Sequence, residues 1–259
     1  MLAQNPLTPF LQKILRRSVL NGDEQGAILS LPVRIEQVPA HVDFVRLGSP
    51  IEHSCLVVHG LAARFGQGPD GNRQITALHL PGDMADLHSL MTPLATSALQ
   101  ALTTTTVVRV PHVALREITA RYPALAEAFW RECVIDAAVL SEWVINIGRR
   151  NAGVRLAHLY CETAFRYRLG EVAENFAFEM PVTQHQLADM LGLTAVHVNR
   201  TVRALVARGL VQVSRGIVTI PSWRRLVEYS DFDPAYLHFE VLPRRSMHVA
   251  VNGAERLHF

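Results

Sequence analysis

The stretch TQHQLADMLGLTAVHVNRTVRALVARGLV, residues 183–211, decides the fold of this chain. Thr183 can cap a helix, because its hydroxyl can accept a hydrogen bond from the backbone of Gln186, whose side chain can complete a capping box. The apolar face of that helix is Leu187, Met190 and Leu191. Gly192 suits the left-handed residue that ends a helix. The stretch therefore opens with a short helix and a tight turn.

A second helix follows this turn at once. Thr194 is its expected N-cap. Its buried face is Val198, Val202 and Leu205, at helical spacing. Ala188, in the first helix, is small where the second helix must approach closely. A helix, a glycine turn and a second helix form a helix-turn-helix, whose second helix enters the major groove of DNA.

The outward face of the second helix is predicted to contact DNA. Its candidate residues are Ala195, Val196, His197, Asn199, Arg200 and Arg203. Arg and Asn can form bidentate hydrogen bonds to purine edges, and His can donate one more. Arg203 and Arg208 are expected to contact DNA phosphates further along the helix. The N-terminus of the helix also favours binding of a phosphate. Thr183, His185 and Thr194 complete the candidate surface beside the first helix.

A β-hairpin wing is predicted directly after the second helix. Strands 211–213 and 217–220 flank a turn at Ser214, Arg215 and Gly216, with Arg215 at the tip. Between residues 184 and 225 there are six arginines and one acid, Asp189, which gives +5 in a chain of net charge +2. This concentrated charge is typical of DNA binding, whereas the alternative is a helix pair with a solvated basic face.

A long helix is predicted upstream, over residues 124–148. Its apolar seam is Ala126, Phe129, Cys133, Ala137, Leu140, Val144 and Ile147, in steps of three and four. Pairing with a second copy would cover this seam, and packing against the chain's own barrel is the alternative. Arg149 and Arg150 interrupt this apolar pattern, and we expect a hinge there. Asn151 is the expected N-cap of a helix at 152–167.

The first part of the chain combines helical and strand patterns. Residues 7–29 have helical spacing, whereas 32–111 hold short β-branched runs separated by turns, which is typical of a small barrel. Residues 170–178 are expected to be a loop. The predicted fold is α+β: a jelly-roll β-roll with N-terminal helices (1–123), a dimerisation helix and hinge (124–150), and a winged helix-turn-helix (151–240). Residues 241–259 are expected to be a flexible tail.

Other functional classes find little support. The three cysteines, Cys55, Cys133 and Cys161, form no CxxC pair, so we expect no disulfide framework, iron–sulfur cluster or other metal site. No signal peptide or apolar run long enough to span a membrane is found, so we expect a soluble, cytoplasmic protein without membrane partners. GxSxG, HExxH and GxxxxGK[ST] are absent, which argues against an enzyme.

The chain resembles the Crp–Fnr superfamily of bacterial transcription regulators. The resemblance covers about residues 7–239 and is strongest in QLADMLGLTAVHVNRTVRALVARGLV. It is clear in LVVHGLAARFGQGPDGNRQITALHLPGDMADLHSLM, which resembles the family's cyclic-nucleotide-binding-like β-roll and phosphate-binding cassette, and the closing FDPAYLHF is typical of a proteobacterial branch. The resemblance implies a jelly-roll sensor, a dimerisation helix, a winged helix, and RNA polymerase as a further candidate partner.

The resemblance places an effector pocket at the cassette. Its candidate residues are Gly82, Asp83, Ala85, Asp86, Leu87, Thr96 and Ser97, with Ser141 on the long helix. In cyclic-AMP-binding members a Gly-Glu pair and an Arg-Ser pair hold the ribose and the phosphate. Here those positions are Ala85, Asp86, Thr96 and Ser97. Because a buried phosphate without its arginine is strongly disfavoured, cyclic AMP is not the expected effector.

Three histidines and one cysteine are candidate haem ligands. His53, Cys55 and His59 share parity on one predicted strand, and His88 lies in the cassette, so each could ligate haem or could be an ordinary residue.

In the recognition helix Ala195, Val196 and Arg200 stand where the family commonly has Arg or Ser, then Glu, then Arg, so we expect a different half-site. Thr183, Thr194 and Arg203 match family positions that touch the DNA backbone.

The resulting hypothesis is a homodimer that binds a pseudo-palindromic operator in double-stranded DNA. An effector at the β-roll, other than cyclic AMP, would shift the angle between the domains at residues 149–151. The alternative is a ligand-independent DNA-binding regulator with a vestigial barrel.

Overall fold

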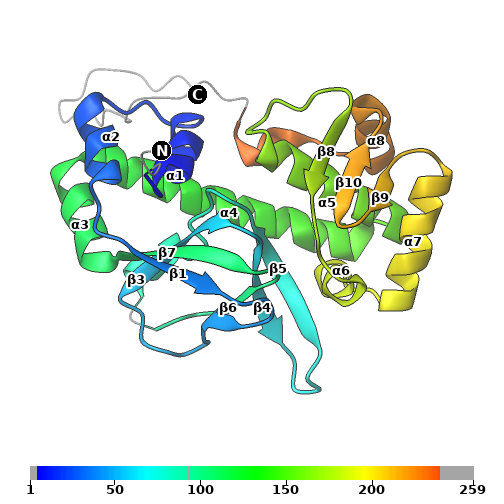
Figure 1. The fold of residues 1–259 in the computed structure, drawn as a ribbon, viewed down its shortest axis with the longest axis horizontal. Helices are drawn as coiled ribbons and strands as arrows, with labels where there is room; N and C mark the ends of the chain where they lie inside the picture. Colours follow the sequence, from blue (N-terminus) through cyan, green and yellow to red (C-terminus); the bar gives the residue numbers. More distant parts are fainter. Residues whose placement is uncertain (1–4, 93, 240–259) are drawn as a thin grey trace, which may run out of the picture.

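The N-terminal half of the computed structural model is a barrel of two antiparallel sheets (Figure 1). The structure describes residues 5–92 and 94–239. The strands are β1 (Arg34–Val38), β2 (Asp43–Val45), β3 (His53–His59), β4 (Ala62–Gln67), β5 (Arg73–His79), β6 (Ala98–Ala101) and β7 (Thr105–Pro111). Their order is β1-β7-β3 in one sheet and β2-β6-β4-β5 in the other. Mostly small and β-branched side chains fill the interior, among them Val38, Cys55, Ala101 and Val107. The predicted barrel is confirmed.

Helices cover the outer face of the β1-β7-β3 sheet. They are α1 (Thr8–Leu15), α2 (Gly22–Leu29), the 3-10 helix η1 (Leu87–Met91) and α3 (His112–Arg121). The helical stretch expected over 7–29 is two helices, because Asn21 starts α2 with a capping box that also uses Glu24. Phe10 and Ile14 of α1 are buried in one cluster with Val108 of β7.

The long helix α4 (Pro123–Arg149) runs past both halves of the molecule (Figure 1). Leu125 and Phe129, near its start, pack in the cluster beneath α1, whereas Ile135 and Trp143 belong to the core around α5. The predicted seam is wrong at Phe129, which is 3% exposed and packs against the Phe10 ring at 5.8 Å between centroids. The opposite face exposes large apolar residues: Trp130, Val134, Leu140, Val144 and Ile145.

The C-terminal half is a winged helix. Its elements are α5 (Ala152–Tyr167), β8 (Phe176–Glu179), α6 (Gln184–Leu191), α7 (Ala195–Ala207), β9 (Gln212–Ser214), β10 (Ile217–Ile220), α8 (Trp223–Ser230) and η2 (Pro234–Leu237). Asn151 caps α5 as predicted. The loop expected at 170–178 is wrong at its end, because Phe176–Glu179 pairs with β10 in a sheet of order β8-β10-β9. The tail expected at 241–259 lies outside the described residues.

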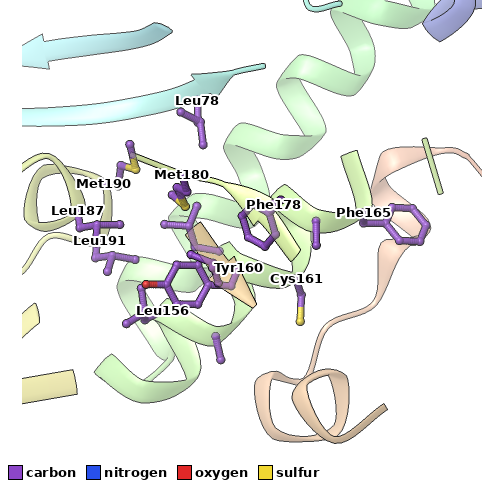
Figure 2. Packing of buried hydrophobic residues seen from close by; sticks show 14 of the residues in the cluster. Leu78, Leu156, Tyr160, Cys161, Phe165, Phe178, Met180, Leu187, Met190 and Leu191 are labelled. Carbon is purple, nitrogen blue, oxygen red and sulfur yellow. The ribbon is translucent and has the colours of Figure 1, made fainter. Parts of the chain in front are cut away.

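One hydrophobic core joins the two halves. Leu78 of β5 lies beside Met180 and Met190 of the winged helix (Figure 2). The Gln74 side chain donates a hydrogen bond to the Asp189 carbonyl at 2.7 Å, and the Gln186 side chain donates to the Leu102 carbonyl at 3.2 Å. The helix-turn-helix is therefore docked on the barrel of its own chain.

Candidate nucleic-acid interface and sensor core

The helix-turn-helix has the local geometry that its sequence predicts. Thr183 Oγ1 accepts from the Gln186 backbone N–H at 3.1 Å, and the Gln186 side chain accepts from the Thr183 N–H at 2.7 Å. Gly192 has φ +61°, in the left-handed region where glycine is favoured. The Thr194 hydroxyl then accepts from the His197 N–H at 3.2 Å and starts α7. These caps fix where α7 begins and which of its faces points outward.

The outward face of α7 is accessible. Exposed candidate residues are Thr183, His185, Thr194, Val196, Arg200 and Arg203, whereas Ala195, His197 and Asn199 are half-buried. Val198, Thr201 and Leu205 are buried on the opposite face. Within the part of the chain that the structure describes, the side chains of Arg200 and Arg203 make no hydrogen bond or ion pair. Their charges are therefore available to a ligand.

The wing ends in a tight two-residue turn. The sequence predicted that Ser214 belongs to the turn. That prediction is wrong, because Ser214 pairs with Ile217 and is the last residue of β9. Arg215 and Gly216 have φ +50° and +77°, the signs required in a type I′ turn. A Cβ atom on Gly216 would lie 2.8 Å from the Pro181 side chain. Ser214 and Arg215 are exposed at the tip, as a DNA-contacting wing requires.

The predicted effector residues divide into a buried and an exposed group. Asp83, Ala85, Asp86 and Leu87 are buried, and Gly82 adopts φ +95° against the Pro9 carbonyl. Thr96 is exposed, and Ser97 is half-buried. Ser141 lies on the exposed side of α4, where its hydroxyl donates to the Ala137 carbonyl at 3.1 Å.

Asp86 is a buried carboxylate inside the barrel. Its Oδ1 accepts from the Cys55 backbone N–H at 2.6 Å, and its Oδ2 has no partner among the described residues. Burial raises the pKa of Asp86 to about 6. An acid in this position repels a phosphate unless a cation lies between them.

Arg64 of β4 supplies a cation that contacts the backbone of the cassette. Its guanidinium donates to the Ala85 carbonyl at 2.6 Å and to Asp136 of α4 at 2.7 Å, with the side chain only 12% exposed. Although burial opposes the shift, Arg64 lowers the pKa of Asp136. Arg64 thus ties the cassette to the long helix without any added ligand.

A network of ion pairs, which we call the junction network, joins four segments of the chain: α1 and its end, the cassette, α4 and α5. It consists of Lys13, Arg17, Asp83, Glu132, Glu162 and Arg166. Asp83 contacts Lys13 at 2.7 Å and Arg166 at 2.6 Å, so the cassette is paired directly with α5 of the winged helix. Burial opposes ionisation of Asp83, but Lys13 and Arg166 outweigh it and lower its pKa.

A small cavity adjoins this network. Asp83, His79, His88 and Asp136 are among its lining residues, and its free space is about 40 Å³. A few water molecules would fit there, whereas drug-sized ligands need about 300 Å³ or more. His79 Nε2 has no partner among the described residues, and burial lowers the pKa of His79 to about 3, so the ring is neutral.

The strand residues considered as haem ligands do not form one set. Cys55 is fully buried, whereas His53 lies beside Arg109 at the barrel rim. A bulge between Val57 and His59 breaks the parity that would have aligned His59 with them. Across residues 5–92 and 94–239, no group of three or more His, Cys, Asp or Glu side chains is arranged to hold a metal ion.

Sequence reasoning missed both Arg64 and the junction network. Alternation along β4 places Arg64 on the inward face with Ala62, and an inward arginine on a short apolar strand could have indicated a buried cation. Glu132 and Asp136 are also acids on the covered part of α4. Their partners lie far away in the sequence, 115 residues for Arg17 and Glu132, which no local pattern reveals.

Comparison with known proteins agrees with this geometry. Residues 35–122 match the cyclic nucleotide-binding domain model, and residues 154–229 match the Crp-like helix-turn-helix model. An anaerobic regulatory protein of Aggregatibacter actinomycetemcomitans is 28% identical over 214 residues, which span 82% of each chain. The transcriptional activator FnrL of Cereibacter sphaeroides is 26% identical, over 72% of this chain and 76% of its own.

Solved structures share the fold. FixK2 from Bradyrhizobium japonicum superposes with a TM-score of 0.69 at 24% identity, covering 78% of this chain and all of its own. A CooA variant from Carboxydothermus hydrogenoformans gives 0.60 at 16% identity, covering 85% and 95%.

A sensor-type barrel joined to an exposed recognition helix and wing defines a DNA-binding transcription regulator. The chain belongs to the Crp–Fnr superfamily, a family of regulators and not of enzymes. None of the described helices is both long and apolar enough to cross a membrane.

Proposed function

We propose that the protein acts as a homodimer that binds a pseudo-palindromic operator. The carrying observation is the exposed apolar face of α4: Trp130, Val134, Val144 and Ile145 are 66%, 60%, 63% and 47% exposed. Positions 130, 134, 137, 141, 144 and 148 follow the four-three spacing of a coiled-coil seam. A second copy of α4 would cover this stripe, and two copies of α7 would then enter major grooves about 34 Å apart.

The candidate DNA contacts are exposed and half-buried residues of the helix-turn-helix and the wing. In this proposal Arg200 and Asn199 read base edges. The sugar-phosphate backbone of the DNA is contacted by Arg203, Thr183, His185, Thr194 and Arg215. Ala195, His197 and Ser214 complete the contact surface. Any activation of transcription would also require contact with RNA polymerase.

The first test is selection of binding sites from random duplex DNA at fixed salt, combined with sedimentation of the free protein. We expect an inverted repeat with centres about one helical turn apart, and a dimer. Val134→Glu should give monomers that bind the operator weakly. Val113→Glu is the matched control, because Val113 is 62% exposed on α3, away from the stripe. A direct repeat, or a dimer that survives Val134→Glu, would contradict the proposal.

The Arg64 contacts favour the ligand-independent form of regulation over an effector-switched one. A cyclic nucleotide fits poorly here, because Thr96 stands exposed where the binding members have an arginine, and Arg64 is already paired with Asp136. On this proposal, purified protein binds its operator at full affinity, and cyclic nucleotides leave its melting temperature unchanged. Arg64→Ala should weaken operator binding. A nucleotide that raises both stability and operator affinity would restore the effector hypothesis.

A further inference from the structure

Val196 is an exposed apolar side chain in the middle of a polar surface. It is 82% exposed, the largest value among the large hydrophobic residues that the structure describes. It is the second residue of α7, directly after Ala195. Scattered exposed apolar residues are ordinary, but here the neighbours on the same face are cationic or polar.

The position of Val196 is fixed relative to Arg200. Residues four apart on a helix lie on the same face, one turn from each other, and Arg203 continues the row three residues later. Both arginines are exposed, and within the described residues their side chains make no hydrogen bond or ion pair. This row therefore presents positive charge with an apolar group at its N-terminal end. The Thr194 cap holds the first turn of the helix in place. A row of this kind is complementary to a polyanion whose inner surface carries an apolar feature.

The DNA major groove has one such feature. Thymine alone presents a methyl group there, at C5, whereas the other base edges present hydrogen-bond donors and acceptors. Valine can neither donate nor accept a hydrogen bond. Seating it against guanine O6 or cytosine N4 would leave a desolvated polar group without a partner, which is costly. Seating it against the thymine methyl group leaves none.

We propose that Val196 is a specificity-determining residue that contacts the C5-methyl group of one thymine in each half-site. This inference rests on the proposed function, because it requires a defined operator. Arg200, one turn along α7, would read a neighbouring base pair. Val196 then selects thymine by its methyl group and not by its hydrogen-bonding edge.

The test replaces each operator thymine singly by deoxyuridine, which removes only the methyl group, and measures affinity at fixed salt. We expect one thymine per half-site to matter, with a loss of about fourfold, the factor that corresponds to burial of one methyl group. Every other thymine should be neutral. The Val196→Ser variant should bind the thymine and deoxyuridine operators equally. Val196→Thr, which has the same shape and keeps one methyl group, should retain part of the preference.

The outcomes are distinguishable. If deoxyuridine is tolerated at every position, or if Val196→Ser loses affinity on replacement as the parent protein does, the Val196 inference is overturned and the operator proposal stands. If no motif is enriched from random DNA, the operator proposal and this inference fall together. Unfolding by urea of both variants verifies that they are folded, since an 82% exposed side chain contributes little to the core.

Discussion

The arginines of α7 and those of the junction network differ in what lies opposite them. Arg200 and Arg203 face solvent, whereas Arg17 and Arg166 are 2% and 12% exposed and lie within 3.0 Å of carboxylates. A buried charge must be paired or the fold loses stability, whereas an exposed charge costs the fold little and remains available for phosphates. The comparison therefore predicts that arginine substitutions in one region change stability and in the other change DNA binding.

The strongest test of this division is Arg166→Ala. It leaves Asp83 and Glu162 buried with one partner fewer and removes the bond to the Leu78 carbonyl. We expect the free energy of unfolding to fall by about 3–5 kcal/mol in urea denaturation. Arg224→Ala is the control, because Arg224 and Glu228 are 80% and 67% exposed and 3.9 Å apart. That change should cost less than about 0.5 kcal/mol. If both substitutions lowered the free energy of unfolding equally, buried and exposed arginines would not differ in their contribution to stability.

A second test uses the buried acid that has no ion-pair partner. The folded state raises the pKa of Asp86 to about 6, so it binds the proton more tightly than the unfolded chain does. Its contribution is complete below the ordinary pKa of 3.8 and is lost as pH rises through about 6. Asp86→Asn removes this dependence.

The measurement is the difference in unfolding free energy between parent and Asp86→Asn across pH 4–7. The difference should shift by up to about 3 kcal/mol in favour of Asp86→Asn as pH rises. Asp83 and Glu132, whose pKa values are lowered, give the opposite trend, but both proteins share it, so it cancels. Parallel stability curves would show that Asp86 is not desolvated as its position implies.

On the exposed side of the comparison, Arg200→Ala should leave stability within about 0.5 kcal/mol. Operator affinity should fall by about 1–3 kcal/mol, and discrimination at one base pair per half-site should relax. Arg121→Ala, at an exposed position on α3, is the matched control for loss of one positive charge. If Arg121→Ala weakens the operator complex as much, the effect is general electrostatics and Arg200 reads no base.

The same contrast explains what could be predicted from the sequence. The caps at Thr183, Gly192 and Thr194 are local signals, each set by residues within a few positions, and all three are confirmed. The seam of α4 was misjudged at Phe129, because its cover, Phe10, lies far away in the chain. β8 was missed for a related reason: it is a short edge strand that pairs, among the described strands, with β10 alone. Local hydrogen bonding is visible in sequence, whereas long-range partners are not.

The smallest expected effect concerns Arg203 and is best seen in salt dependence. If Arg203 neutralises a phosphate, Arg203→Ala should lower operator and non-operator affinity nearly equally. The slope of log affinity against log salt should become shallower by about one per half-site, because one fewer counterion is released. Arg200→Ala should instead reduce operator affinity much more than non-operator affinity. Fluorescence anisotropy titrations at several salt concentrations separate the two. If Arg203→Ala leaves the slope unchanged, Arg203 does not face a phosphate, and the exposed charge of α7 is not all directed at DNA.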